Sequence, residues 1–226
     1  MRISIIVPAL NEEDNIVSSL DCLKQFRLDG HEVIVVDGGS EDKTIELATF
    51  RADKVINSIP GRAQQMNAGA KQSSGDVLWF LHADTLVPDN ALHEILGVFE
   101  NKKYQWGRFD IRLSGKQLLL RVIEGLMNLR SRTTGIATGD QGIFMRRELF
   151  ESVGCFAPIP LMEDLDISKR LKKLSRPCCL TTKLVTSSRR WEENGILRTV
   201  LLMWRLRLAY TLGARPEKLV NHYQVK

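Results

Sequence analysis

Cysteine is scarce in this chain of 226 residues, which holds only Cys22, Cys155, Cys178 and Cys179. Small secreted scaffolds that depend on disulfides are much denser in cysteine, and structural zinc sites need closely spaced pairs of ligands. We therefore set both classes aside. A reducing, cytoplasmic setting is the simplest interpretation of so few cysteines.

Long apolar runs and blocks of like charge are also missing. The most apolar segment, Ile196 to Leu212, contains three arginines and falls short of the roughly 20 apolar residues that a membrane span needs. Only Arg2 separates the start from the first apolar residues, without a small-residue cleavage site, so we expect no signal peptide. The net charge of +5 is mild and no basic tail is present, so we expect no nucleic-acid partner.

The C-terminal apolar segment is predicted to form a helix over Leu197 to Leu212, with apolar residues nearly all the way round. Such a helix packs on its own domain, forms a homodimer face, or lies on a membrane surface. We expect packing ahead of the other two. A membrane contact would make the protein peripheral at the inner face of the membrane.

Apolar strands alternate with helices through the first 100 residues, which predicts βαβ units and an open parallel sheet. We expect Pro8 to end the first strand, because proline cannot donate to a sheet ladder. The expected strands are Ile3 to Val7, Glu32 to Val36, Lys54 to Ile56 and Val77 to Leu81. The expected helices cover Glu12 to Phe26, Glu41 to Ala52, the small-residue segment after Pro60, and Pro88 to Glu100.

The pattern changes after Lys103. An antiparallel strand is predicted over Trp106 to Leu113 and a helix over Leu118 to Leu129, while Arg130 to Asp140 is polar and predicted to be a mobile loop. A later helix is expected over Ile167 to Leu174. The prediction is one α/β domain with a mostly parallel sheet flanked by helices, a small antiparallel part and a C-terminal helix.

Asp37 ends a strand of four β-branched residues, which is typical of the interior of a parallel sheet. Gly38 and Gly39 supply the turn, and Ser40 is expected to cap the next helix. A carboxylate at this strand end lies where open α/β sheets bind ligands, so we expect Asp37 to contact a nucleoside. The first strand is not followed by Gly-x-Gly-x-x-Gly, which argues against a dinucleotide fold.

His82-Ala83-Asp84 also follows a buried strand. Mg²⁺ and Mn²⁺ prefer carboxylate oxygens and need few protein ligands where phosphates and water complete their shell. We expect Asp84 to be a metal ligand. His82 either assists the metal, orients Asp84, or is an ordinary strand-end histidine bonded to the backbone.

Glu163, Asp164 and Asp166 form an acidic cluster at the start of a helix. Compensation of the helix dipole would account for such acids, but the proline-rich loop before them does not need three of them as caps. A sugar hydroxyl that acts as a nucleophile needs a base within hydrogen-bonding reach, so Glu163 or Asp164 is a candidate base.

Two arginine-containing segments are further candidates. Arg62 has the geometry to bind a diphosphate, and the alternative is a solvated loop residue. Arg189-Arg190-Trp191 pairs cations with an aromatic ring, either as a surface contact or over a sugar or diphosphate leaving group.

Four short segments share their order with a known set of motifs: Pro8-Ala9-Leu10-Asn11-Glu12-Glu13, Val36-Asp37-Gly38-Gly39-Ser40, His82-Ala83-Asp84 and Glu163-Asp164. They resemble the opening motif, the Asp-Asp-Gly-Ser nucleotide motif, the Asp-x-Asp metal motif and the late Glu-Asp motif of family 2 glycosyltransferases of the GT-A fold. The ordered set is far more specific than any one motif.

The resemblance implies an inverting glycosyltransferase that takes a nucleotide-diphosphate sugar, most often a UDP-sugar, and binds a divalent metal, Mn²⁺ or Mg²⁺. Asp37 then matches the contact to the base, Asp84 the metal ligand, and Asp164 or Glu163 the catalytic base. The other donor-site residues predicted are Pro8, Ala9, Asn11, Glu12, Gly38, Arg62, Asn67, His82 and Ala83. Those predicted at the acceptor or leaving group are Asp140, Gln141, Arg190 and Trp191.

The chain departs from the family pattern at three positions. His82 replaces the first acid of the metal motif, and Gly38 replaces the second acid of the nucleotide motif. Processive members carry a Gln-x-x-Arg-Trp motif, and this chain has Ser187 in place of the glutamine. This difference argues against polysaccharide synthesis. The chain is most similar to a small bacterial subgroup that implies no acceptor. We predict a donor-binding half (1–103), an acceptor-binding half (104–191) and a C-terminal helical extension (192–226).

Two other functions fit parts of the sequence. A sugar nucleotidyltransferase would carry a glycine-rich basic loop after the first strand, whereas this chain is acidic there, and an acidic loop is a poor triphosphate cradle. A non-catalytic nucleotide-sugar binder or membrane-docked adaptor would dock through the C-terminal helix.

Overall fold

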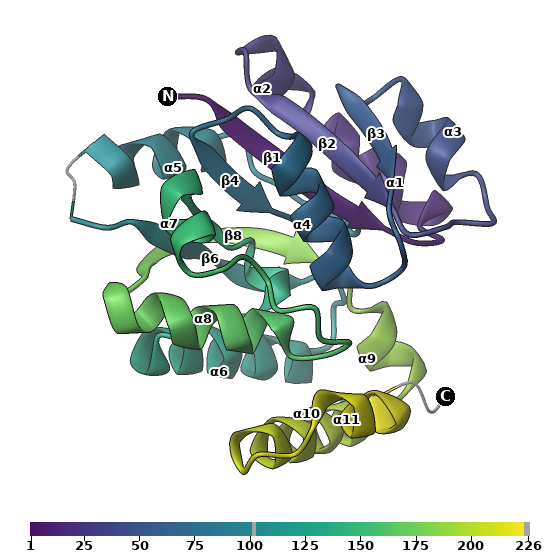
Figure 1. The fold of residues 1–226 in the computed structure, drawn as a ribbon. Coiled ribbons are helices and arrows are strands. Elements are labelled where there is room, and N and C mark those ends of the chain that lie inside the picture. Colours follow the sequence, from purple (N-terminus) through teal and green to yellow (C-terminus); the bar gives the residue numbers. More distant parts are fainter. Residues whose placement is uncertain (101–102, 224–226) are drawn as a thin grey trace.

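The computed structural model of the protein describes residues 1–100 and 103–223, so 101–102 and the last three residues of the expected C-terminal extension lie outside the described residues. One twisted sheet carries helices on both faces (Figure 1). The strands are β1 (Ile3–Ala9), β2 (Glu32–Asp37), β3 (Lys54–Asn57), β4 (Val77–Phe80), β5 (Thr85–Leu86), β6 (Trp106–Leu113), β7 (Phe144–Arg146) and β8 (Cys178–Thr186). The helices are α1 (Glu13–Asp21), α2 (Lys24–Leu28), α3 (Thr44–Thr49), α4 (Arg62–Gln72), α5 (Ala91–Glu100), α6 (Leu118–Thr134), α7 (Arg147–Ser152), α8 (Glu163–Leu174), α9 (Arg189–Glu193), α10 (Ile196–Thr211) and α11 (Pro216–Tyr223), with a 3₁₀ turn η1 (Gly139–Gln141).

The strand order is β3-β2-β1-β4-β7-β6-β8-β5. Strands β3, β2, β1 and β4 run parallel, β7 is antiparallel to both its neighbours, and β8 runs parallel to β6 and antiparallel to β5. The expected α/β class, with a mostly parallel sheet and a smaller antiparallel part, is therefore confirmed.

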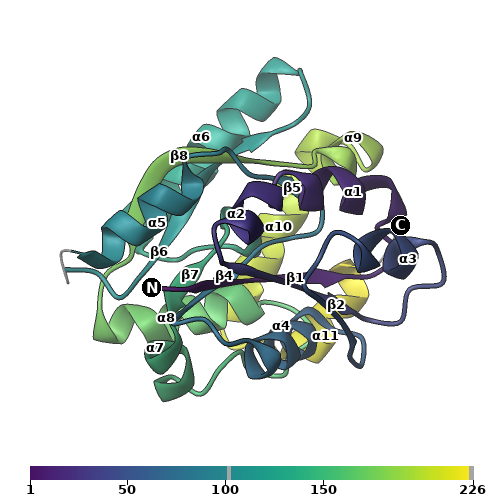
Figure 2. The ribbon, with the colours of Figure 1, turned by 90° about the horizontal axis from the view of Figure 1, so that it is seen from above.

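Successive residues of the central strands point to opposite faces and supply a core on each. Ile5 and Val35 pack with side chains of α1, α2, α3 and α5, whereas Ile6 and Ile34 pack with α4, α7 and α8. Figure 2 shows α1 and α2 on one side of β1 and α4 on the other. The continuous apolar runs of β1 and β2 follow from this double burial.

The first strand does not end at Pro8, as the sequence suggested, but continues to Ala9. The carbonyl of Ile6 accepts from Leu81 N, so Ile6 and, two residues on, Pro8 turn their backbone groups towards β4. Because β4 ends at Phe80, no β4 carbonyl lies opposite position 8. Proline, which has no backbone N–H, therefore loses no sheet hydrogen bond there.

Two expected helices are shorter or divided. The segment expected as one helix from Glu12 to Phe26 is α1 and α2, and Leu23 at their junction is buried in the core with Phe26. Helix α3 begins at Thr44, so Ser40 is not its cap. Ser40 instead bonds Asp37.

The prediction of a mobile loop over Arg130 to Asp140 was wrong. Helix α6 continues to Thr134 and ends at Gly135 in the left-handed conformation (φ 68°), a common end for a helix. Ala137 and Thr138 are buried, and Ser168 Oγ bonds both the N–H and the carbonyl of Ala137. Polarity alone misled the prediction, because these groups are paired inside the fold.

The C-terminal segment forms two helices, α10 and α11, of which the sequence predicted only the first. Leu206 of α10 and Leu219 of α11 are buried against Leu161 and Leu165 at the start of α8. Figure 1 shows this helical pair at the opposite side of the molecule from β2 and β3. Within the described residues no helix is both long and apolar enough to cross a membrane.

Candidate active site

The carboxyl ends of β1, β2 and β4 meet at one edge of the sheet, where open α/β folds bind ligands. Strand β5 follows Asp84 directly and pairs with β8, so that Thr85 lies opposite Thr186. This pairing brings the segment after β8, which contains Arg190 and Trp191, beside Asp84 although more than 100 residues separate them in sequence.

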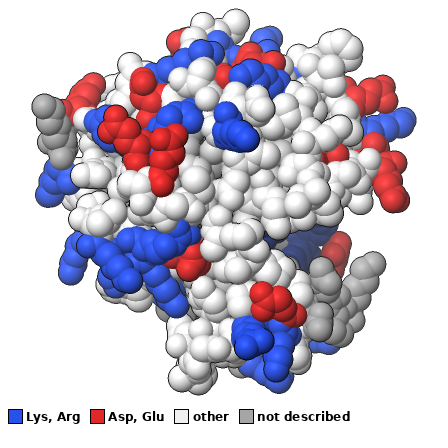
Figure 3. Space-filling model, in the orientation of Figure 1, with Lys and Arg blue, Asp and Glu red and all other residues white. Residues whose placement is uncertain are grey.

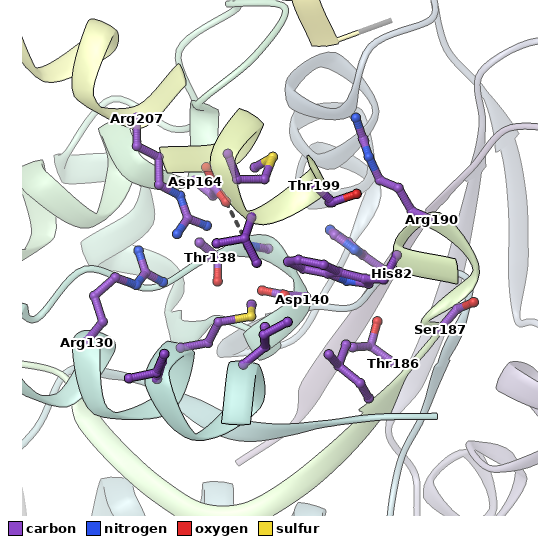
Figure 4. A pocket seen from close by; sticks show the side chains of 18 of the residues that line it. His82, Arg130, Thr138, Asp140, Asp164, Thr186, Ser187, Arg190, Thr199 and Arg207 are labelled. Atoms are coloured by element: carbon purple, nitrogen blue, oxygen red, sulfur yellow. Dashed lines mark hydrogen bonds between the residues drawn. The ribbon is translucent and has the colours of Figure 1, made fainter. Parts of the chain in front are cut away.

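A cavity of about 720 Å³ opens at this edge. Its lining includes eight of the predicted site residues: Glu12, Arg62, His82, Asp84, Asp140, Asp164, Arg190 and Trp191. In Figure 4 the labelled side chains other than Thr199 lie in three groups along the cavity: His82, Thr186, Ser187 and Arg190, then Thr138, Asp140 and Asp164, then Arg130 and Arg207. The structure therefore brings the metal motif, the late acidic motif and the Arg-Trp segment into one space.

Asp37 lies outside this lining and is 1% exposed. Its Oδ2 accepts from the N–H groups of Gly39 (2.7 Å) and Ser40 (2.9 Å), and its Oδ1 accepts from Ser40 Oγ (2.5 Å). The carboxylate closes its own turn, and Asn11 fastens that turn to the end of β1 by donating its N–H to Ser40 Oγ (2.9 Å).

Gly38 touches the side chain of Gln65, which would lie 3.0 Å from a Cβ added at this position. Gln65 Nε2 donates to the carbonyls of Ala9 and Val36, both at 2.8 Å, and so ties the ends of β1 and β2 together. A second acid at position 38 has no room unless Gln65 moves, which gives the departure from the family motif a physical reason.

Asp84 and His82 follow β4 in a turn closed by Thr85 N–H on the His82 carbonyl (3.2 Å). Burial and the nearby Glu12 carboxylate raise the pKa of Asp84 to about 6. Burial and the charge of Arg62 lower the pKa of His82 to about 3, so its imidazole is neutral. Gly139 lies against this ring, since an added Cβ would be 2.5 Å from His82 Nε2.

These residues fit a divalent cation that takes most of its ligands from a donor and water. Asp84 Oδ1 is buried without a hydrogen-bond partner, which is unusual for a carboxylate oxygen and leaves this atom free to bind a cation. A complete protein cage is not present, because no group of three or more His, Cys, Asp or Glu in the described part of the chain has metal-binding geometry. A neutral imidazole nitrogen can bind a transition-metal cation, so His82 can serve as a second ligand.

Glu163 and Asp164 form the first turn of α8, four residues before the start expected from sequence. Asp164 Oδ2 accepts from Gly139 N–H (2.9 Å) and its Oδ1 from Leu165 N–H (2.7 Å). Burial raises the pKa of Asp164 despite these bonds. Glu163, 6% exposed, has its pKa raised to about 7 by burial and by Asp164, while the charge of Arg62 acts in the opposite direction.

Replacing Glu163 by glutamine should stabilise the protein at neutral and higher pH. The raised pKa means that the folded state holds the Glu163 proton more tightly than the unfolded state, so stability falls as pH rises from 4.5 towards about 7. Above this range Glu163→Gln should gain on the order of 2 kcal/mol in free energy of unfolding, and below it almost nothing. Urea denaturation at the two pH extremes measures this. The same change at exposed Glu148 should show no such pH dependence, and an equal gain at both extremes would contradict the prediction.

The other predicted residues lie outside the lining and make contacts within the fold. The Asn67 side chain exchanges two hydrogen bonds with the backbone of Phe156 (2.9 and 3.0 Å). Gln141 is fully buried and accepts from Thr138 N–H (3.1 Å). The Ala83 carbonyl accepts from Ser19 Oγ (2.6 Å). Pro8 and Ala9 belong to β1.

Sequence reasoning missed a second part of the cavity, which α6 and α10 supply. Arg130 on α6 and Arg207 on α10 line it together with apolar side chains of the same two helices. The spacing Ile123, Met127, Arg130 and the spacing Val200, Met203, Arg207 each follow one helical face. An arginine at the end of an apolar stripe was the signal available in the sequence.

Residues 4–154 match the family described as Glycosyl transferase family 2. This match covers more than half of the chain, so the protein belongs to that family. The predicted membership of family 2 is thereby confirmed, on a match that contains the first three motifs and ends before Glu163-Asp164.

Relatives with curated descriptions cover different shares of the chain. The "Undecaprenyl-phosphate 4-deoxy-4-formamido-L-arabinose transferase" of Yersinia pestis (strain Pestoides F) is 27% identical over an alignment 158 residues long, which includes 64% of this chain and 48% of that protein. The "Probable glycosyltransferase YdaM" of Bacillus subtilis (strain 168) is 26% identical over an alignment 236 residues long, which includes 94% of this chain and 55% of that protein. The chain thus spans about half the length of these relatives.

Solved structures share the fold at low sequence identity. S. aureus TarS 1-349 in complex with UDP-GlcNAc superposes with a TM-score of 0.66 at 20% identity, covering 83% of this chain and 58% of that one. The mannosyltransferase PcManGT of Pyrobaculum calidifontis, in complex with GDP-Man and Mn²⁺, gives a TM-score of 0.67 at 22% identity, covering 92% and 61%. The fold is that of the GT-A glycosyltransferases.

Proposed function

We propose that the protein is an inverting glycosyltransferase that moves a sugar from a nucleotide-diphosphate sugar, most simply a UDP-sugar, to an acceptor hydroxyl. The observation that carries this proposal is that Asp84 and Asp164 line the same cavity. One acid stands at the donor edge of the sheet and the other at the start of α8, as a metal-bound diphosphate and a nucleophile would require.

Asp164 is the proposed base. It lines the cavity, whereas Glu163 does not, and its raised pKa makes it a better proton acceptor than an ordinary aspartate. Glu163 lies within electrostatic reach of Arg62 and helps to hold that cation near the donor site. The acceptor hydroxyl gives its proton to Asp164 as its oxygen bonds the anomeric carbon, and the nucleoside diphosphate leaves with the electron pair of the broken bond.

Asp84, with neutral His82 as an assisting ligand, would hold Mn²⁺ or Mg²⁺. The metal, when bound, would supply positive charge to the diphosphate of the donor. Arg62 adds a guanidinium that suits phosphate oxygens. Arg190 donates a hydrogen bond to the Tyr223 carbonyl (3.0 Å) and is the cation proposed at the acceptor or leaving group, beside Trp191.

A donor screen tests the proposed function. Purified protein is incubated with UDP- and GDP-sugars with Mn²⁺ or Mg²⁺, and nucleoside diphosphate release is measured with and without candidate acceptors. We expect release from one donor class in a metal-dependent manner. Binding of a nucleotide sugar without release under all conditions would favour a non-catalytic binder instead.

Replacing Asp84 by alanine should abolish the strengthening of UDP binding by Mn²⁺, a loss of about tenfold or more, because the buried oxygen Oδ1 is then gone. Isothermal titration calorimetry with UDP, in the presence and absence of Mn²⁺, measures the difference. Exposed Asp89→Ala is the matched control and should retain the metal effect. An unchanged metal effect in Asp84→Ala would remove Asp84 from the metal site.

A further inference from the structure

The cavity changes character along its length. Near the donor edge it is polar, but between α6 and α10 it is lined mainly by apolar residues, among them Leu126, Leu129 and Trp204. These three side chains are 53%, 57% and 63% exposed, so they lie at the mouth. A site for a small sugar acceptor alone would not need such a wall.

Two arginines stand between this apolar mouth and Asp164. Figure 4 shows the side chains of Arg130 and Arg207 approaching each other from α6 and α10, on the side of Thr138 away from His82. Nε and Nη2 of Arg130 and Nε of Arg207 are buried without hydrogen-bond partners. Within the described chain neither guanidinium takes part in an ion pair or a side-chain hydrogen bond.

Two unpaired cations placed together are costly unless a ligand compensates them. Burial and the charge of Arg207 lower the pKa of Arg130 to about 10, so Arg130 remains charged at neutral pH. Asp140 and Asp164 are near enough to act on Arg130 electrostatically, but they do not bond to it. A pair of guanidinium groups with free N–H donors is well suited to the oxygens of a phosphate.

The surface around the mouth favours a lipid as the carrier of that phosphate. Helix α6 exposes Val122, Leu126 and Leu129, and α10 exposes Leu201 and Trp204, each by more than half. Figure 3 shows lysine and arginine side chains gathered where α8 ends, and its last turn contains Lys172 and Lys173. Exposed apolar residues beside basic ones suit an anionic lipid surface.

We propose that the acceptor is an anionic lipid whose phosphate binds between Arg130 and Arg207, whose chain leaves along the α6–α10 mouth, and whose head group presents a hydroxyl to Asp164. From its mouth inwards, the cavity presents an apolar wall, then the arginine pair, then Asp164 and the edge of the sheet where the donor is proposed to bind. This order matches the order of chain, phosphate and head-group hydroxyl in such a lipid. This inference rests on the proposed function and assigns its acceptor. The same proton transfer applies, with the lipid hydroxyl as the nucleophile.

Binding of octyl phosphate, octanol and inorganic phosphate tests the site, because these probes carry both features or only one of them. Trp204 and Trp191 line the cavity and report binding by fluorescence. Octyl phosphate should bind more tightly than either single-feature probe. Arg130→Gln and Arg207→Gln should each weaken it by roughly 10- to 100-fold, the value of charge-assisted hydrogen bonds.

Exposed Arg205, two residues before Arg207 on α10, gives the matched control: Arg205→Gln should bind octyl phosphate normally. Removing an unpaired buried charge does not cost stability, so the thermal midpoints of the two cavity variants should equal or exceed that of the wild type. Inorganic phosphate that binds as tightly as octyl phosphate would replace the lipid by a small anion. Octanol that binds as tightly, or unchanged binding in both cavity variants, would overturn the arginine site.

The donor screen separates this inference from the proposed function. Donor turnover together with no binding of octyl phosphate would leave the glycosyltransferase standing and remove the lipid acceptor. Octyl phosphate binding that depends on both arginines, without turnover of any donor, would keep the anionic lipid site in a protein that is not a transferase.

Discussion

Asp164→Asn should lower the rate of sugar transfer by about 10²- to 10⁴-fold, the usual contribution of a general base. Asparagine keeps the size of the side chain and an oxygen that can accept the Gly139 N–H, but it cannot take the acceptor proton. Donor binding should change little. Steady-state kinetics with the donor found in the screen, together with calorimetric donor affinity, separates the two effects.

Asp166→Asn is the control for this experiment. Asp166 lies on the same turn of α8 but pairs with Arg170 (2.6 Å) and does not line the cavity. It should retain nearly full turnover. If Asp164→Asn also retained it, Glu163 would become the candidate base.

Asp110→Ala should destabilise the fold by about 3–5 kcal/mol, because it leaves the guanidinium of Arg108 buried without its carboxylate. Arg108 is 0% exposed and is held by Asp110 and by the Asn128 carbonyl, while Arg132 binds the other oxygen of Asp110 at 2.6 Å. This network fixes α6, one wall of the cavity, to β6.

Urea denaturation measures the loss, and a double variant identifies its cause. Arg108→Met combined with Asp110→Ala removes both buried charges, so it should recover much of the stability that Asp110→Ala loses. Arg112→Ala, an exposed arginine on the same strand, should stay within about 0.5 kcal/mol of the wild type. A double variant no more stable than Asp110→Ala would mean that packing, not the buried charge, holds the network.

Short motifs predicted much of the candidate site because their residues sit directly after buried strands or at a helix start. His82 and Asp84 follow β4, and Asp164 opens α8, so local sequence was enough to mark them. The motifs were a poorer guide to which side chains face the cavity. Asp37 and Gln141 belong to the expected site segments, yet their side-chain oxygens bond within their own turns.

The roles proposed for these residues depend on contacts that no local pattern specifies. Asp84 meets the segment of Arg190 only because β5 pairs with β8, and Arg130 meets Arg207 only because α10 lies across from α6. The mistaken loop over Arg130 to Asp140 has the same origin. The backbone N–H groups of Ala137 and Gly139 in this segment donate to Ser168 and Asp164 of α8, which lie 25 to 31 residues further along the chain.

The amino-acid sequence by itself determined the α/β class, the family and the positions of the acidic motifs, since strand burial, helix starts and strand-end turns are local properties of a few neighbouring residues. Only the tertiary structure decided what lies opposite the edge where β1, β2 and β4 end. The buried, unpartnered nitrogens of Arg130 share one cavity with Asp164 and Arg207, which lie 34 and 77 residues further along the chain, because packing of α6, α8 and α10 around the sheet brings them together.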